Sequence, residues 1–166
     1  MTNSARVATQ LLLALVLAVT LTAIPAGAEI KSHEGWSVVP TPHTYQALID
    51  RVGKAAKAHA IGVVTRASAT VGASKVLGQT IPGNMVIGLY HPRFAVRMLK
   101  ASVAAGIEAP IRVYITENEN GSATLSYKTP SSVFAPYMDE GGEALKELAL
   151  ELDALFAKLT HEAAGQ

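Results

Sequence analysis

The sequence predicts an α+β domain in which helices pack on one face of a mainly antiparallel sheet. Two patterns carry this prediction. Residues 111–116 and 123–128 alternate apolar and polar side chains on either side of Asn120-Gly121, which is typical of two half-buried strands joined by a hairpin turn. Residues 140–161 carry apolar side chains at intervals of three and four, which predicts a long C-terminal helix.

The first elements follow from local patterns. Residues 36–40 predict a strand, and Thr41-Pro42 has the arrangement of a helix start, in which a capping hydroxyl precedes a proline. From Tyr45 the apolar side chains recur at helical spacing, which predicts a helix that Gly62 ends. A second strand is expected to begin at Val63.

The middle of the chain predicts a short helix at 71–77, a loop at 79–84 and a buried strand at 85–90. His91-Pro92 opens a further helix, which Gly106 ends. The side chains of this helix that are expected to face the core are Phe94, Met98, Leu99 and Val103. Residues 129–137, with two prolines, are expected to form an irregular connection.

The N-terminus has the pattern of a signal peptide. Arg6 precedes an apolar run at residues 11–24, and small residues lead to a cleavage site after Ala28. The run is shorter than the ~20 residues that a membrane-spanning helix needs, which argues against an uncleaved anchor. We therefore expect a single periplasmic or secreted domain at 29–166, without stable membrane insertion after cleavage.

Composition excludes several classes of function. The chain has no cysteine, so it has no disulfide framework, thiolate metal site, cysteine nucleophile or lipidated cysteine. The formal net charge of +1 gives no basic footprint for nucleic acid.

Residues 85–137 resemble the domain of unknown function 302 family. The shared pieces are a strand that ends in an Asn-Pro-like step, here His91-Pro92, a helix, the Gly106-x-x-x-Pro110 approach to a hairpin, and the exit Tyr127-x-x-Pro130. The resemblance implies a compact α+β domain with a curved antiparallel sheet that is generally dimeric, and it implies no activity. The sequence departs from the family pattern at His91, where asparagine is usual, and near Ser68, where a histidine is common.

A ligand site is predicted where the helix at His91 begins. Unpaired N–H groups at a helix start favour an anion, and Arg93 and Arg97 share one face of that helix with Lys100. The alternative is a capping histidine beside a solvated basic stripe.

Three tyrosines, Tyr90, Tyr114 and Tyr127, could line one wall of a pocket with Thr129, or could simply pack in the core. Arg112 is expected to pair with an acid such as Glu117 or to meet water. The residues predicted to bind the ligand are Tyr90, His91, Arg93, Arg97, Tyr127 and Thr129.

No catalytic or metal motif is found. No two of the five histidines lie three or four residues apart, and serine-hydrolase, phosphate-loop and dinucleotide patterns are absent. The sequence therefore favours an exported non-catalytic homodimer, without cofactor or metal, that binds a small ligand, an anion being one candidate, or a periplasmic partner protein. Two alternatives stay open: a protein that handles a metal or sulfur species, and an enzyme acting on a small anionic substrate near His91.

Overall fold

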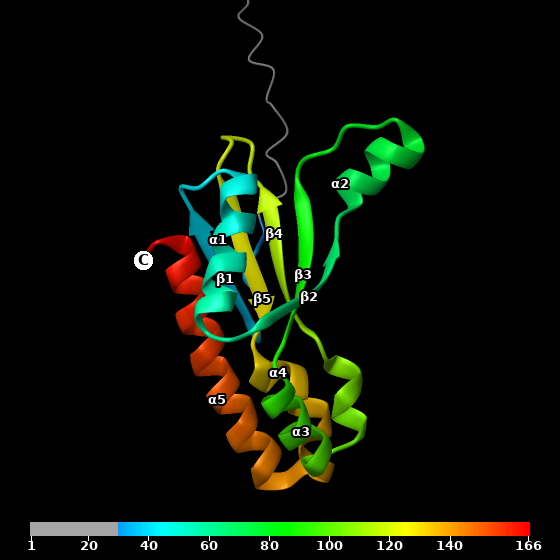
Figure 1. The fold of residues 1–166 in the computed structure, drawn as a ribbon, viewed down its shortest axis with the longest axis vertical. Coiled ribbons are helices and arrows are strands. Elements are labelled where there is room, and N and C mark those ends of the chain that lie inside the picture. The colour runs from blue at the N-terminus through cyan, green and yellow to red at the C-terminus, as the bar shows by residue number, and fades with distance from the viewer. Residues whose placement is uncertain (1–29) are drawn as a thin grey trace, which may run out of the picture.

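A computed structural model describes residues 30–166, which form one five-stranded sheet with helices against it (Figure 1). The predicted signal peptide at 1–28 lies outside the described residues. The strand order is β1–β5–β4–β3–β2, and every neighbouring pair is antiparallel, so the predicted α+β class is confirmed. The strands are β1 (Trp36–Thr41), β2 (Gly62–Ala67), β3 (Asn84–Tyr90), β4 (Ile111–Glu117) and β5 (Ala123–Lys128).

Two helices, α1 and α5, cover one face of the sheet. The α-helices are α1 (Tyr45–Ala58), α2 (Ala69–Gly72), α3 (Pro92–Ala101), α4 (Pro130–Phe134) and α5 (Met138–Ala164). Short turns of other helix types are η1 (Ala73–Leu77), η2 (Ala104–Glu108) and η3 (Ala135–Tyr137). Helix α1 contacts β4 and β5, and α5 contacts α1 and β1. Helices α3 and α4 pack on α5 beyond the end of the sheet, while α2 stands away from the body (Figure 1).

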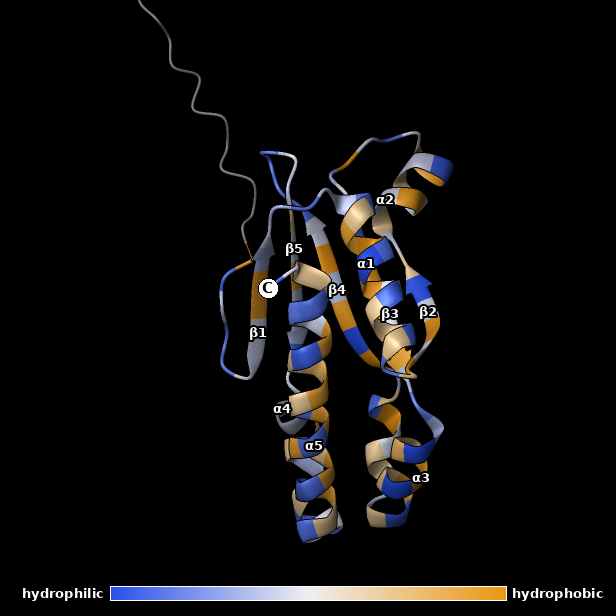
Figure 2. Ribbon diagram, turned by 60° about the vertical axis from the view of Figure 1, so that its left-hand side comes forward, coloured by the Kyte–Doolittle hydropathy of each residue, from blue (hydrophilic) through white to orange (hydrophobic). Residues whose placement is uncertain are grey.

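The core lies between the sheet and α1 and α5. Hydrophobic and hydrophilic residues alternate along β4 (Figure 2), as the hairpin pattern predicts. Val113, Ile115 and Leu125 are fully buried in one cluster with Leu48 of α1 and Leu148 of α5. The helix-covered face of the sheet therefore contains the buried apolar residues of β3, β4 and β5.

The start of α1 differs from the prediction. Thr41 is the last residue of β1, and its hydroxyl donates to the carbonyl of Ala123 at 2.8 Å. The helix cap is Thr44, whose Oγ1 accepts from the N–H of Ala47. Pairing with β5 therefore decides the role of Thr41. Helix α1 also ends at Ala58 rather than at Gly62, which begins β2.

Helix α3 is shorter than predicted. It ends at Ala101 because Ser102 leaves the helical conformation, and Gly106 lies inside η2. Phe94 and Met98 are buried as expected, but Leu99 and Val103 are 45% and 75% exposed.

The connection expected at 129–137 is helical. Thr129 Oγ1 accepts from the N–H of Ser132, and Pro130 occupies the first turn, so this pair starts α4. The long C-terminal helix is confirmed, with non-helical backbone at Gly142 (φ 54°, ψ −151°) near its start. Of the described helices, none is long and apolar enough to cross a membrane.

Candidate functional site

The face of the sheet opposite α1 and α5, here called the open face, carries two adjacent cations. Trp36 on β1 pairs with Lys128 on β5. The pairing of β4 with β5 ends at Val113 and Tyr127, and Arg112 and Lys128 are the next residues of the two strands, so they lie near each other. These three side chains, Trp36, Lys128 and Arg112, form what we call the basic row.

A second row of side chains lies two residues further along the strands, on the same face. It consists of Val38, Ser126, Tyr114 and Val86, which are consecutive cross-strand partners. We call it the serine row. Two residues along a strand span roughly 7 Å, so the two rows are close enough to contact one small molecule.

The two rows, apart from Val38, form the floor of a groove of about 730 Å³. Val133 of α4 borders it, as do residues 67–69 at the junction of β2 and α2. The charged side chains lining the groove are Arg112, Lys128 and Glu108, which together give a net charge of +1.

The hydroxyl of Ser126 belongs to the floor of the groove and is not hydrogen-bonded. Ser126 is 0% exposed, and its Oγ has no hydrogen-bond partner among the described residues. Because its neighbours Leu125 and Tyr127 face the helices, the Ser126 side chain points into the groove. A buried hydroxyl without a partner is destabilising, and such groups in native structures commonly mark a function.

The cations of the basic row have no acidic partner. Within residues 30–166, neither Arg112 nor Lys128 forms an ion pair. The Lys128 ammonium lies 5.9 Å from the centre of the Trp36 ring. The third charge in the groove, Glu108, accepts a 2.8 Å hydrogen bond from the Tyr137 hydroxyl, and this bond raises the pKa of Tyr137.

The predicted ligand residues lie in several places. Tyr90 and His91 line a separate apolar pocket of about 40 Å³ beside Phe94 and Phe156. His91 caps α3, because its Nδ1 accepts from the N–H of Arg93 at 3.1 Å. The imidazole therefore does the capping work that an asparagine would do at this position.

The two arginines of α3 are engaged locally. The guanidinium carbons of Arg93 and Arg97 lie 5.2 and 5.9 Å from the centre of the Phe94 ring. Arg97 also pairs with Glu151 of α5. Neither arginine lines the pocket at His91.

Tyr127 and Thr129 contribute to packing and capping. Tyr127 borders the groove, but it is 4% exposed and its ring lies 5.7 Å from that of Phe156 on the helix side. Thr129 caps α4. Tyr114 points to the open face, so the structure separates it from Tyr127 rather than placing both on one wall.

The sequence does not predict that the serine row lines a groove. The alternation of the hairpin indicates that Arg112, Tyr114 and Ser126 share a face, but it gives no sign that this face is a groove. Glu117, the expected partner of Arg112, accepts instead from the N–H of Gly83 at 2.7 Å, and Arg112 is exposed.

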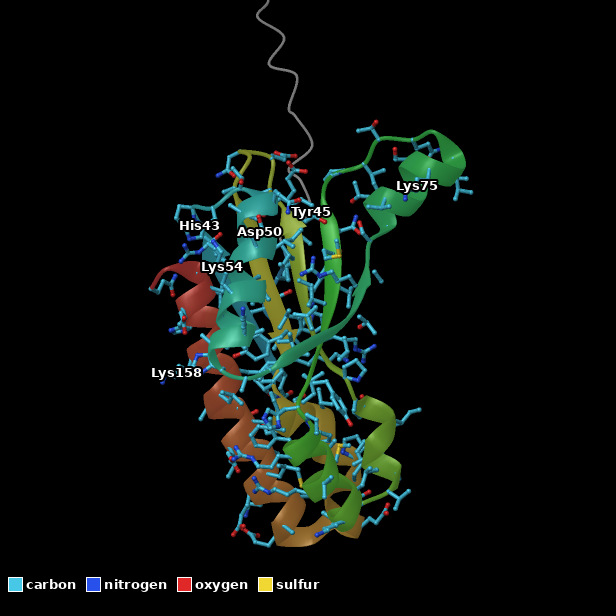
Figure 3. All side chains as sticks on the ribbon, viewed as in Figure 1. His43, Tyr45, Asp50, Lys54, Lys75 and Lys158 are labelled. Atoms are coloured by element: carbon cyan, nitrogen blue, oxygen red, sulfur yellow. The ribbon has the colours of Figure 1, made fainter. Side chains whose placement is uncertain are left out.

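In the described part of the chain, no three side chains of the types His, Cys, Asp and Glu gather as metal ligands. His59 pairs with Glu162, and His43 contacts the Ala164 carbonyl at the end of α5 (Figure 3). Ser68, the second departure from the family pattern, caps α2 and borders the groove.

Comparisons with known proteins identify the fold family. The model of the domain of unknown function DUF302 matches residues 37–162. The crystal structure of an uncharacterized conserved DUF302 protein from Bacillus stearothermophilus is similar, with a TM-score of 0.70 and 19% identity over 79% of this chain and 99% of that chain. No curated protein matches the sequence. The chain belongs to the DUF302 family.

Proposed function

We propose that this protein is a non-catalytic binding protein that holds a small anionic ligand in the groove on its open face. The observation that carries the proposal is the Ser126 hydroxyl, fully buried and without a partner beside two unpaired cations. A ligand acid group would neutralise the cations, and it would accept from the hydroxyl once the side chains that cover Ser126 turn aside.

The basic row supports an anion for a second reason. Like charges directly opposite each other on neighbouring strands are destabilising. Arg112 and Lys128 approach this relation just past the last β4–β5 pair, and neither forms an ion pair with a carboxylate of the described residues. Hydrogen bonds from charged donors to an anion are about twice as strong as neutral ones, so a bound acid would offset the repulsion.

The chemistry of the groove supports binding rather than catalysis. A serine becomes a nucleophile when a base within hydrogen-bond reach takes its proton. None of the described residues that line the groove is a histidine, and Ser126 Oγ has no base at hydrogen-bond distance. The one carboxylate there, Glu108, already accepts from Tyr137.

Thermal unfolding in the presence of anions tests the proposal, because a ligand that binds only the native state raises the melting temperature. Acetate, benzoate and phosphate would be compared at equal ionic strength. We expect anion-dependent stabilisation that is lost in the double variant Arg112→Ala/Lys128→Ala. The matched control, Arg93→Ala/Lys100→Ala, removes the same charge from α3 and should keep it. Equal loss in both variants, or no stabilisation by any anion, would contradict the proposal.

We further propose export, on the signal-peptide pattern of residues 1–28. Expression of the full gene in a Gram-negative host should yield a periplasmic protein whose N-terminal residue is Glu29. A cytoplasmic protein that retains the leader would contradict this.

We also propose a homodimer, for which the family resemblance and the arm formed by α2 and η1 (residues 69–77) are the support. Neither helix of the arm has a buried residue, and Val76 and Leu77 are 81% and 65% exposed. Short helices are marginal without tertiary packing, so a partner surface would stabilise the arm. Light scattering should give a dimer at micromolar concentration and a monomer for Val76→Asp/Leu77→Asp. Val103→Asp is the control. A monomeric unmodified protein would contradict the dimer.

A further inference from the structure

We propose that the ligand of the groove is a singly charged amphipathic carboxylate whose apolar body lies along the serine row; this inference rests on the proposed function. The groove combines a charged end and an apolar floor in one continuous surface.

The charge of the lining favours one negative charge on the ligand. Arg112 and Lys128 supply two positive charges, and Glu108 supplies one negative charge at the same groove. The carboxylate of Glu108 is held in place by the Tyr137 hydroxyl at 2.8 Å. A monoanion balances the remaining charge of +1, whereas a dianion such as a phosphate monoester would leave an excess negative charge beside Glu108.

The distribution of polar atoms gives the ligand two unlike ends. At the basic row, long exposed side chains can reach over a carboxylate, and the Ser126 hydroxyl is fixed on the floor next to it. Beyond Ser126 the lining holds Val86, the ring of Tyr114 and the small residues Ala67 and Ala69, with the polar side chains of Ser68 and Asn84 only at its far end. An apolar body placed there removes these side chains from water, which an inorganic anion cannot do.

The size of the groove fits a small organic molecule. Its volume of about 730 Å³ lies within the range of about 300–1,000 Å³ that is usual for ligand sites. From the basic row to Asn84, at the far end of β3, the strands advance by four residues, or roughly 13 Å. A carboxylate on a fused ring pair or a medium-length chain occupies such a length.

Isothermal titration calorimetry with four probes tests the inference on the unmodified protein. Naphthalene-2-carboxylate carries both parts of the expected ligand, acetate carries only the acid, naphthalene-2-methanol carries only the rings, and 2-naphthyl phosphate carries a second charge. We expect the naphthoate to bind at least about tenfold more tightly than each of the other three. Val86→Thr, which adds a hydroxyl to the apolar floor at nearly constant size, should weaken the naphthoate several-fold and leave acetate unchanged. Val96→Thr, on the exposed side of α3, is its control.

The outcomes separate this inference from the proposed function. If acetate or phosphate binds as tightly as the naphthoate, and binding still requires Arg112 and Lys128, the groove binds anions but the amphipathic ligand is wrong. If no probe binds, or if naphthoate binds equally to Arg112→Ala/Lys128→Ala, both proposals fail. If no probe binds and the same double variant turns a dimer into a monomer, a second copy occupies the open face, which also overturns the inference.

Discussion

At the scale of single residues, Ser126 shows a conflict between stability and binding. Its hydroxyl is removed from water without gaining a hydrogen bond in the chain. Leaving a buried donor unsatisfied costs about 1–3 kcal/mol of stability. Residues that break a local rule of folding are expected at functional sites, where a ligand supplies the missing partner.

Gly88 shows how tightly the open face is packed at one edge. A Cβ at this position would lie 2.2 Å from Thr65 Oγ1 and 2.6 Å from Pro110 Cγ, so a side chain cannot enter without a shift of its neighbours. We expect Gly88→Ala to lower the free energy of unfolding by about 1–3 kcal/mol. Urea unfolding would measure the change.

The control for this prediction is Gly72→Ala. Gly72 lies in helix α2, and no heavy atom lies within 4 Å of a Cβ built there. Alanine should therefore stabilise the helix by about 0.5–1 kcal/mol. Similar effects of the two substitutions would show that crowding does not decide the residue at position 88.

At the scale of elements, the last turn of α5 depends on α1. The guanidinium of Arg51 donates to the carbonyls of Glu162 and Ala163, and His43 contacts the carbonyl of Ala164. The last carbonyls of a helix have no partner within the helix and carry the negative end of its dipole. A cation that donates to these carbonyls gives them hydrogen-bond partners and also stabilises the negative end of the helix dipole.

We therefore expect Arg51→Ala to destabilise the protein by about 1–2 kcal/mol, because two charged hydrogen bonds are lost, one of them to the partly buried carbonyl of Ala163. Lys54→Ala removes a positive charge from an exposed position of the same helix (Figure 3) and is the control. Urea unfolding, with hydrogen exchange of the amides at the end of α5, measures both. Equal stability of the two variants would contradict the role of Arg51.

Helices and strands were predictable from the sequence where the spacing of apolar side chains agrees with the turn or capping residues at their ends. The alternation around Asn120-Gly121 predicts β4 and β5, and the apolar stripe predicts α5, because each pattern is repeated over many residues. Helix α4 was missed although Thr129-Pro130 is a cap signal, since two prolines within nine residues favour a loop. Thr41 was misassigned because its hydroxyl serves the sheet, and a cap cannot be told from a strand end by sequence alone.

At the scale of the whole molecule, the site depends on strand order. The order β1–β5–β4–β3–β2 brings Trp36 beside Lys128 and Arg112, which are far away in sequence. Local periodicity shows which residues share a face of one strand, but not which strands are neighbours. The sequence therefore predicted the α+β class and the hairpin, while the groove required the topology.

The stability of the protein at alkaline pH depends on the surroundings of two tyrosines, Tyr137 and Tyr45. Hydrogen bonding to Glu108 raises the pKa of Tyr137, and burial raises the pKa of Tyr45 above the ordinary value of 10.0. A phenol whose pKa is higher in the folded state binds its proton more tightly there. Its contribution to stability is complete below pH 10 and is lost as the pH rises through the folded pKa.

We expect the free energy of unfolding to fall as the pH rises above about 10, and to fall less steeply in Tyr137→Phe. Tyr90→Phe, at a more exposed position, is the matched control. Urea unfolding between pH 8 and 11 measures the slopes. An identical slope for Tyr137→Phe and the unmodified protein would show that the contact with Glu108 does not couple folding to this proton.

If the open face keeps the buried hydroxyl of Ser126 for a ligand, removal of that hydroxyl should help the free protein and harm the complex. Urea unfolding of the unmodified protein and of Ser126→Ala, each with and without naphthalene-2-carboxylate, measures both effects. We expect Ser126→Ala to be more stable than the unmodified protein without ligand, by about 1 kcal/mol, and to gain less from the naphthoate. A variant that is less stable without ligand, or that gains as much from the naphthoate as the unmodified protein does, would show that the hydroxyl is not kept for a ligand.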